Sequence, residues 1–426
     1  IGRKNPSKSI RIVTMKPISI SLSPNTEPDD VLFALKLLFQ PWKWRRGKAN
    51  EDLEYEFAEY LQINSAVSFN SGRSALMAIL SVLGFKEGDE ILLQAFTCNA
   101  VPNPVLWEGL KPVYVDCRED DYNMDAEDLE QKITQKSRAV IVQHTFGLPA
   151  DLEKIQSICQ KHNLVLIEDC AHALGARYKG RFVGTFGKLA FFSFSRDKVI
   201  SSVYGGMAVT NDTALSHQLR YFQEHAGYPS LFWVKQQLRH PLLMNWVVLP
   251  TYSLLGKYVL VLFQWFCILS KAVHWKEKQG KKPSYFPKRL PNALALLALK
   301  QLRKLSRFNE HRKKLAALYD SELKNSVFEL PQAFPEREHI FLRYPIRHEK
   351  AHEIIRDAWK QNLLIGDWYT TPIAPHDTKA GAMGYTEGTC KNAENLSQKT
   401  LNLPTHINIS FKHAKTIADF LKRYGG

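Results

Sequence analysis

The sequence predicts an α/β protein of two domains, built on a mainly parallel sheet. The chain has 426 residues, more than one hydrophobic core usually serves. From about Asp52 to Asp212, short runs rich in Val and Ile alternate with helical patterns, as they do in parallel βα units. Because these apolar runs are continuous, we expect helices to cover both faces of the sheet.

The composition narrows the function classes. With 45% hydrophobic and 23% charged residues, the chain is typical of a packed globular protein. A net charge of +15 favours anionic partners such as nucleotide diphosphates, nucleic acid or an acidic membrane face. No nucleic-acid-binding signature is visible in the sequence, so we expect no nucleic-acid partner. The six cysteines are scattered without metal-ligand spacing, so we expect no metal site and a reducing, cytoplasmic location.

The first half of the chain supplies the expected sheet. The strands are predicted at 66–69, 90–93, 112–115, 139–142 and 165–167. We assign residues 17–230 to a large domain, preceded by a basic tail over residues 1–16.

The second half divides into an apolar insert over residues 231–285 and a smaller domain over residues 286–426. A helical pattern from Leu290 to Leu318 predicts one long helix leading into that domain. A strand over 340–346 and amphipathic helices over 350–360 and 411–423 follow.

The most informative segment is VLIEDCAH, residues 165–172, in which an apolar strand ends in Asp169. In open α/β sheets, ligands bind at the carboxyl ends of strands. A buried aspartate there can keep a pyridine nitrogen protonated through a charge-assisted hydrogen bond. The alternative is that Asp169 caps a helix, and this segment alone does not separate the two.

A second strand runs into a polar turn that holds Lys198. A lysine amine forms a Schiff base with an aldehyde once it is deprotonated, and it can then carry a proton between substrate and cofactor. Most single lysines are solvated surface charges. Here Ser193 offers a hydroxyl for a phosphate oxygen, and Gly205-Gly206 allow the backbone to turn tightly beside the lysine.

The third segment, VSFNSGRSAL at residues 67–76, is predicted to be a strand, a short turn at Gly72 and a helix. The first free amides of a helix bind phosphate well. An ordinary capped helix has the same pattern. Together with the other two segments, it supplies a phosphate cup.

Taken together, the three segments resemble the DegT/StrS family of pyridoxal-phosphate (PLP) sugar aminotransferases. Further matches in the family's order are WRRG at 44–47, GLKPVYVDC at 109–117, HTFGLP at 144–149, GGMAVTND at 205–212 and KNAENLSQKTLNLPTH at 391–406. The resemblance implies the type I aminotransferase fold, with a mainly parallel seven-stranded sheet in the large domain and a smaller C-terminal α/β domain.

The resemblance also implies the roles of individual residues. Lys198 is the Schiff-base lysine and proton shuttle, and Asp169 binds the pyridine nitrogen of the cofactor. His172 lies near the phenolic oxygen. The expected cofactor-binding set, including the phosphate ligands at the start of the helix and on the second strand, is Gly72, Arg73, Ser74, Cys98, Asp169, His172, Ser193 and Lys198.

Four positions depart from the family pattern. Arg73 stands where members usually have Thr, and an arginine there could add a direct salt link to phosphate. Cys98 stands where many members stack an aromatic ring on the cofactor. Tyr204 replaces a common Glu, and Pro287 lies near the place where an Asn of the partner subunit often reaches the phosphate. These changes affect substrate identity and phosphate contacts more than the lysine chemistry.

The function implied by the resemblance is transfer of an amino group from an amino acid, usually glutamate, to a keto sugar that is typically nucleotide-linked. Members are homodimers that complete each active site across the interface. Two alternatives stay open. One is PLP chemistry on a lipid-linked or acyl substrate at a membrane, and the other is a non-catalytic, membrane-associated relative. Retention of Lys198, Asp169 and Ser193 argues against the second.

The insert is almost free of charge between Leu242 and Leu269. Spanning a bilayer takes about 20 apolar residues, and here Lys257 interrupts the stretch. A single span would place two parts of one enzyme on opposite sides of the membrane. We therefore expect peripheral membrane contact through residues 242–275, at the inner face of the membrane, held by aromatic and basic residues. The alternative is a helical pair buried in a dimer interface or under the C-terminal domain.

Overall fold

A seven-stranded sheet forms the centre of the large domain in the computed structural model, which describes residues 16–425. Nearly all of the predicted basic tail lies outside the described residues. In spatial order the strands are β2 (Ser65–Phe69), β11 (Gly206–Thr210), β10 (Leu189–Ser193), β7 (Val165–Asp169), β6 (Ser137–Gln143), β3 (Glu90–Gln94) and β5 (Lys111–Val115). Only β11 runs antiparallel to its neighbours, so the predicted mainly parallel sheet is confirmed.

Helices cover both faces of this sheet, as its continuous apolar strands predict. Along β6, Val140 and Val142 join one core, and Ala139 and Ile141 join the other. The first core is covered by α1 (Pro28–Leu38), α2 (Ala49–Leu61), α5 (Ala126–Gln131), α6 (Leu152–Lys161) and α10 (Asn292–Leu302). The second is covered by α3 (Gly72–Val82), α4 (Pro102–Trp107), α7 (Thr213–Ala226) and α13 (Lys391–Lys399).

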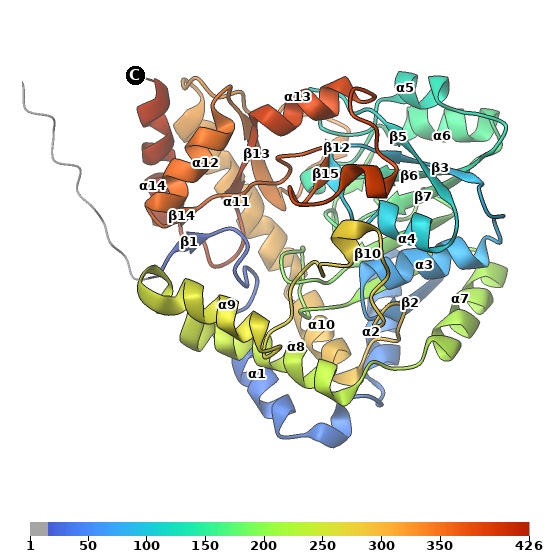
Figure 1. Cartoon of the computed structure of the whole chain (residues 1–426), viewed down its shortest axis with the longest axis horizontal. Coiled ribbons are helices and arrows are strands. Elements are labelled where there is room, and N and C mark those ends of the chain that lie inside the picture. The colour runs from blue at the N-terminus through green and yellow to red at the C-terminus, as the bar shows by residue number, and fades with distance from the viewer. Residues whose placement is uncertain (1–15, 426) are drawn as a thin grey trace, which may run out of the picture.

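The smaller domain packs its own core around a two-stranded sheet (Figure 1). Its strands are β13 (Arg343–Arg347) and β16 (Thr400–Pro404), and its helices are α11 (Leu305–Leu323), α12 (Ala351–Lys360) and α14 (Phe411–Leu421). The strand predicted from residue 340 begins later, because the amides of Ile340 and Leu342 donate to Gly147 and Phe146 of the large domain.

Short strands pair residues from the first half of the chain with residues from its second half. β1 (Ile18–Ser19) pairs with β14 (Leu363–Leu364), so the start of the described chain lies in the smaller domain's neighbourhood. β4 (Thr97–Cys98) pairs with β15 (Ile373–Ala374) beside the carboxyl end of the large sheet. A third group contains β8 (Arg177–Tyr178), β9 (Arg181–Phe182) and β12 (Arg337–Glu338).

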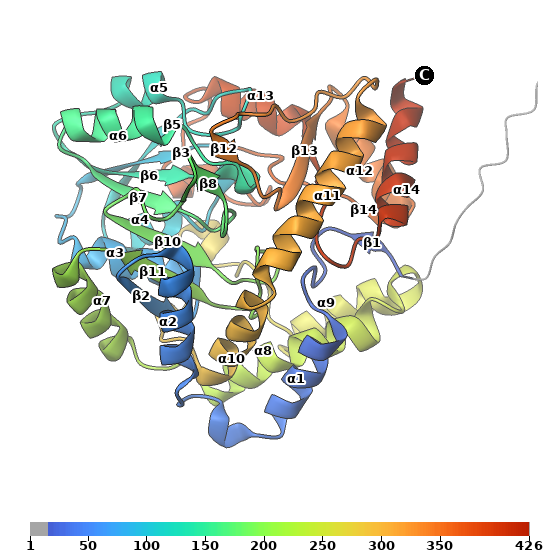
Figure 2. The ribbon, with the colours of Figure 1, turned by 180° about the vertical axis from the view of Figure 1, so that it is seen from behind.

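The prediction of one long helix from Leu290 to Leu318 is wrong. The segment forms two helices, α10 and α11, with a break at Arg303 and Lys304. The break lets α10 pack on α2 while α11 packs on α14 of the smaller domain (Figure 2). At the break, the ammonium of Lys304 binds the carboxylates of Glu27, Asp29 and Asp30, between 2.7 and 3.1 Å away.

The insert forms a bent helical unit along one side of the molecule (Figures 1 and 2). Its helices are α8 (Leu231–Leu243), the π-helical turns η3 (Met244–Val248) and η4 (Tyr252–Gly256), and α9 (Lys257–Trp265). Within residues 16–425, no single helix is long and apolar enough to cross a bilayer. The pair of segments 231–248 and 252–265 meets that criterion only together and is bent by 108°.

Candidate active site

A cavity of about 190 Å³ opens at the carboxyl ends of β7 and β10. Its wall combines strand ends of the large domain, a loop of the smaller domain and the end of the insert. The predicted residues on this wall are Gly72, Arg73, Cys98, Asp169, His172, Ser193 and Lys198. The structure therefore brings together seven of the eight residues that the sequence selects.

Ser74 is the predicted residue that does not line the cavity. Its side chain is fully buried, and its hydroxyl donates to the Asn70 side chain over 2.6 Å. Its amide donates to Ser71 Oγ, the N-cap of α3, over 3.0 Å. Gly72 and Arg73 are the first residues of that helix, so their amides have no partner within it. Free amides at the start of a helix suit an anion.

The cup depends on glycine where β11 passes beneath it. A Cβ at Gly206 would lie 2.3 Å from the carbonyl carbon of Ser71 and 2.4 Å from the amide nitrogen of Gly72. Any larger residue would push the start of α3 away from the sheet. The Gly-Gly pair noted in the sequence thus brings the cup close to β10.

Asp169 is the last residue of β7 and is buried. Its Oδ1 accepts the Ala171 amide over 2.9 Å. Among the described residues, no hydrogen bond to its other oxygen is present, which leaves Oδ2 for a ligand. Burial raises the pKa of this carboxyl, while the Ala171 amide and the Lys198 ammonium act in the opposite direction.

Lys198 lies in the turn after β10 and lines the same cavity. Enclosure by the protein lowers the pKa of its amine, although Asp197, Cys98 and Asp169 favour the charged form. The Nζ lies 4.7 Å from the centre of the Trp368 ring. A lowered pKa increases the fraction of neutral, nucleophilic amine at a given pH.

The turn that carries Lys198 is held from behind. The Asn25 side chain donates to the carbonyl of Lys198. Arg312, which is fully buried, donates to the carbonyl of Val199 over 2.7 Å and to Asn25 Oδ1 over 2.9 Å. Burial lowers the pKa of Arg312 to about 9. These contacts fix the backbone at the lysine and at the residue after it.

Arg73 lines the cavity, but its guanidinium faces the insert. One nitrogen forms a buried ion pair with Glu277, and the other donates to the carbonyl of Ala272 over 3.1 Å. Burial disfavours the charge on Arg73, but Glu277 together with Tyr204, Tyr285 and Cys98 outweighs this and keeps the pKa of Arg73 above the ordinary arginine value. The direct salt link to phosphate that the sequence suggests would compete with this ion pair.

An aromatic stack forms the wall on the side of the smaller domain. His172 lies between the rings of Trp368, 5.1 Å away, and Phe146, 6.4 Å away. Burial lowers the pKa of His172 well below its ordinary value, so the ring is neutral. Its Nδ1 is buried and has no hydrogen-bond partner among the described residues. Tyr369 approaches the other ring nitrogen, with its hydroxyl 3.4 Å away.

The sequence reasoning missed Trp368, Tyr369 and Arg343. Trp368 and Tyr369 lie about 170 residues beyond Lys198 in the chain, on a loop of the smaller domain. Arg343 lies about 150 residues beyond Lys198, on the strand β13. The guanidinium of Arg343 stacks on Trp368, 3.2 Å from the ring centre. The run of polar and aromatic residues at 367–371 was the available signal, but nothing local to it indicates a cavity.

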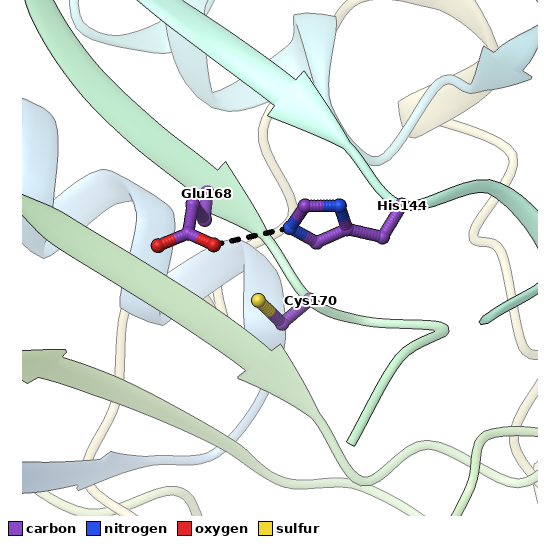
Figure 3. Close-up of side chains that lie close together, drawn as sticks. All are labelled: His144, Glu168 and Cys170. Atoms are coloured by element: carbon purple, nitrogen blue, oxygen red, sulfur yellow. Dashed lines mark hydrogen bonds and ion pairs between the residues drawn. The ribbon is translucent and has the colours of Figure 1, made fainter. Parts of the chain in front are cut away.

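Behind Asp169, a buried group of His144, Glu168 and Cys170 offers donor atoms of the kind that bind metals (Figure 3). Glu168 accepts the His144 ring over 3.1 Å and three backbone amides of residues 184–187 over 2.7 Å each. The His144 Nδ1 accepts the Ala150 amide, so its Nε2 carries the proton. These hydrogen bonds occupy the metal-binding atoms of His144 and Glu168, and they hold the end of β7 in place.

The cavity fits PLP in its chemistry. The free oxygen of Asp169 suits a protonated ring nitrogen, the Lys198 amine suits an aldehyde, and the amides at the start of α3 suit a phosphate. The unpartnered, buried Nδ1 of His172 is a further polar atom that a ligand can satisfy.

Comparisons with known proteins agree with this chemistry. The model of the DegT/DnrJ/EryC1/StrS aminotransferase family matches residues 29–240 and 264–422. Between these two ranges, the unmatched residues 241–263 lie in the insert.

Curated relatives carry sugar-aminotransferase and other names. GDP-perosamine synthase of Escherichia coli O157:H7 is 38% identical over 182 residues, which cover 43% of this chain and 50% of that protein. A UDP-N-acetyl-3-dehydro-alpha-D-glucosamine 3-aminotransferase of Acidithiobacillus ferrooxidans is 27% identical over 93% of this chain and 94% of its own. The pleiotropic regulatory protein of Geobacillus stearothermophilus is 29% identical over 89% and 91%.

Solved structures share the fold. DesV of S. venezuelae, in complex with a ketimine intermediate, superposes with a TM-score of 0.71 at 25% identity, over 93% of this chain and 94% of its own. Helicobacter pylori PseC, an aminotransferase involved in the biosynthesis of pseudoaminic acid, gives a TM-score of 0.75 at 23% identity, over 96% and 99%.

Replacing the enclosed amine should stabilise the protein without cofactor. Below its lowered pKa, Lys198 is charged and burial of that charge destabilises the folded state. This cost disappears as the pH rises towards the ordinary lysine value of 10.5. Lys198→Met should therefore raise the free energy of unfolding at neutral pH by about 1 kcal/mol for each unit of lowered pKa, and with it the melting temperature. The gain should shrink at higher pH.

Thermal unfolding of the cofactor-free protein across this pH range measures the effect. Lys188→Met, at a half-exposed lysine, is the matched control. A gain that does not change with pH would show that the amine of Lys198 carries no buried charge.

Proposed function

Because this chain belongs to the DegT/DnrJ/EryC1/StrS aminotransferase family, a family of PLP-dependent sugar aminotransferases, we propose that it transfers an amino group from glutamate to a nucleotide-linked keto sugar. The observation that carries the proposal is the convergence of Lys198 and Asp169 on one cavity at the ends of neighbouring parallel strands. Relatives named for GDP- and UDP-linked sugars support a nucleotide-linked acceptor, as does the net charge of +15.

When bound, PLP supplies an electron sink that stabilises negative charge on the substrate carbon next to the amine. The carboxylate of Asp169 holds the proton on the ring nitrogen. The Nζ of Lys198, with its lowered pKa, would carry a proton from the carbon of the amino-acid donor to the cofactor in the first half of the reaction, and from the cofactor to the acceptor carbon in the second half. The neutral ring of His172 donates a hydrogen bond and adds no charge. Ser193 and the amides of Gly72 and Arg73 hold the phosphate.

We further propose that the insert binds an anionic membrane surface. One side of α9 packs inward, where Leu260 and Phe263 contact the small core of Met244, Val248 and Leu269. The other side projects Tyr258, Val261, Leu262 and Trp265, which share one helical face and are all exposed. Trp265 has 75% of its surface exposed, and Leu255 on the preceding turn has 65%. Exposed apolar area of this extent marks an interaction surface.

The charge around this face favours a lipid headgroup layer over a second protein surface of the same sequence. Between Leu242 and Ser270 the chain contains no acidic residue. Lys257, at the start of α9, and Lys271, after its end, are exposed. A helix of nine residues is about 14 Å long, which suits a position in the plane of the interface. The enzyme would then work at the inner face of the membrane.

The proposal has two finer points, the assembly and the acceptor. The resemblance supports a homodimer with shared active sites. A lipid-linked keto sugar is the alternative acceptor, and the exposed insert favours it. Assays that supply glutamate with either nucleotide-linked keto sugars or lipid extracts distinguish the two acceptors, because the aminated product appears in the aqueous or the organic phase.

The cofactor and its lysine can be tested by visible absorption of the purified protein supplied with PLP. The wild type should show an absorption band that borohydride removes, and Lys198→Ala should lack it because the variant has no amine to bond the cofactor. Lys360→Ala, at an exposed lysine, should keep the band. A wild type without any band would contradict the enzymatic proposal.

The membrane contact can be tested by flotation with vesicles. The wild type should bind vesicles that contain phosphatidylglycerol more tightly than vesicles of phosphatidylcholine alone. Val261→Glu should weaken binding by about tenfold or more, since it removes one apolar side chain from the face that enters the membrane and adds a charge there.

Tyr221→Glu is the control, because this exposed residue lies on α7 at the opposite side of the molecule (Figures 1 and 2). If Val261→Glu leaves vesicle binding unchanged but converts a dimer to a monomer, the face is a contact between copies instead.

A further inference from the structure

The last part of the insert returns to the cavity. After α9, residues 270–277 cross above the start of α3, and Ala272 and Val273 line the cavity beside Ser71, Gly72 and Arg73. We call residues 270–277 the strap. It lies at the phosphate end of the site, so the insert contributes directly to the cavity wall.

A first clamp holds the strap at its far end. Glu277 is completely buried, and its carboxylate pairs with Arg73 of the phosphate cup. The same carboxylate accepts the amide of His274 over 2.7 Å, and the carbonyl of Glu277 accepts the Asn103 side chain over 3.0 Å. Since burying two charges is costly without this geometry, the pair specifies where the strap lies.

A second clamp holds the near end against the lysine turn. Arg196, two residues before Lys198, donates to the hydroxyl of Ser270. That hydroxyl donates to Gln237 of α8 over 2.7 Å. Next to it, the hydroxyl of Tyr204 donates to the carbonyl of Lys271 over 2.7 Å. The strap is therefore held against the start of α3 by an ion pair and against the lysine turn by hydrogen bonds.

We propose that the strap is a built-in wall of the PLP phosphate subsite, and that Arg73 is a positioning residue which holds this wall through Glu277. The inference rests on the proposed cofactor function. The guanidinium of Arg73 binds the strap, and the phosphate is bound by the amides at the start of α3. Loosening the strap opens the phosphate end to water and to cofactor loss.

Equilibrium binding of PLP alone tests this, without any sugar substrate. Glu277→Gln removes the charge that holds the strap but keeps its size. The PLP dissociation constant should rise by about tenfold or more, because the variant leaves Arg73 buried without its counter-ion. Glu54→Gln is the matched control. Glu54 is also buried and paired with an arginine, but that arginine, Arg220, does not line the cavity, whereas Arg73 does.

An unchanged or tighter dissociation constant in Glu277→Gln would overturn the proposal, because it would make Arg73 a phosphate ligand with which Glu277 competes. A wild type that fails to bind PLP would instead contradict the proposed function itself.

A second measurement needs no variant and so avoids loss of folding. Trypsin cleaves after Lys271, which is exposed within the strap, and after Lys360, which is exposed on α12. Added PLP should slow cleavage after Lys271 several-fold and leave cleavage after Lys360 unchanged. Equal rates with and without PLP at Lys271, in protein that binds the cofactor, would overturn the proposal.

Discussion

The site depends on enclosing an amine and a carboxylate together at one edge of the sheet. Enclosure lowers the pKa of Lys198 and raises that of Asp169, so each group is placed where its charged form is disfavoured. Such positions persist only when the surroundings hold them. Arg312 and Asn25 hold the lysine turn from behind, and the hydrogen bonds of Glu168 hold the strand end that carries Asp169.

The sequence predicted this centre because its signals are local. An apolar strand that ends in a polar residue identifies both Asp169 and Lys198, and parallel strands bring such ends to one edge. The loop with Trp368 and Tyr369 could not be found in this way, since its approach depends on how the smaller domain packs. The break between α10 and α11 escaped for the same reason, because the helical pattern continues through it. The role of Ser74 was expected from the motif, but its hydroxyl turns to Asn70.

Two of the residues that depart from the family pattern, Arg73 and Tyr204, are explained by the same structural feature. Arg73 and Tyr204 both bind the strap, through Glu277 and Ala272 in the first case and Lys271 in the second. The unusual side chains and the insert thus form one feature. The exposed face of α9 and the strap on the cavity wall are separated by only a few residues of the same chain. A contact made by α9 can therefore move the strap at the phosphate end of the site.

The contacts of Asn25 determine when, during synthesis of the chain, the lysine turn can form. Its side chain donates a hydrogen bond to the carbonyl of Lys198. Arg312 donates hydrogen bonds both to Asn25 and to the carbonyl of the residue after the lysine. On a ribosome, the segment that contains Asn25 emerges early and must wait for most of the chain before these partners exist. The lysine turn therefore closes late, because its contacts with Arg312 cannot form in a nascent chain until α11 has left the exit tunnel.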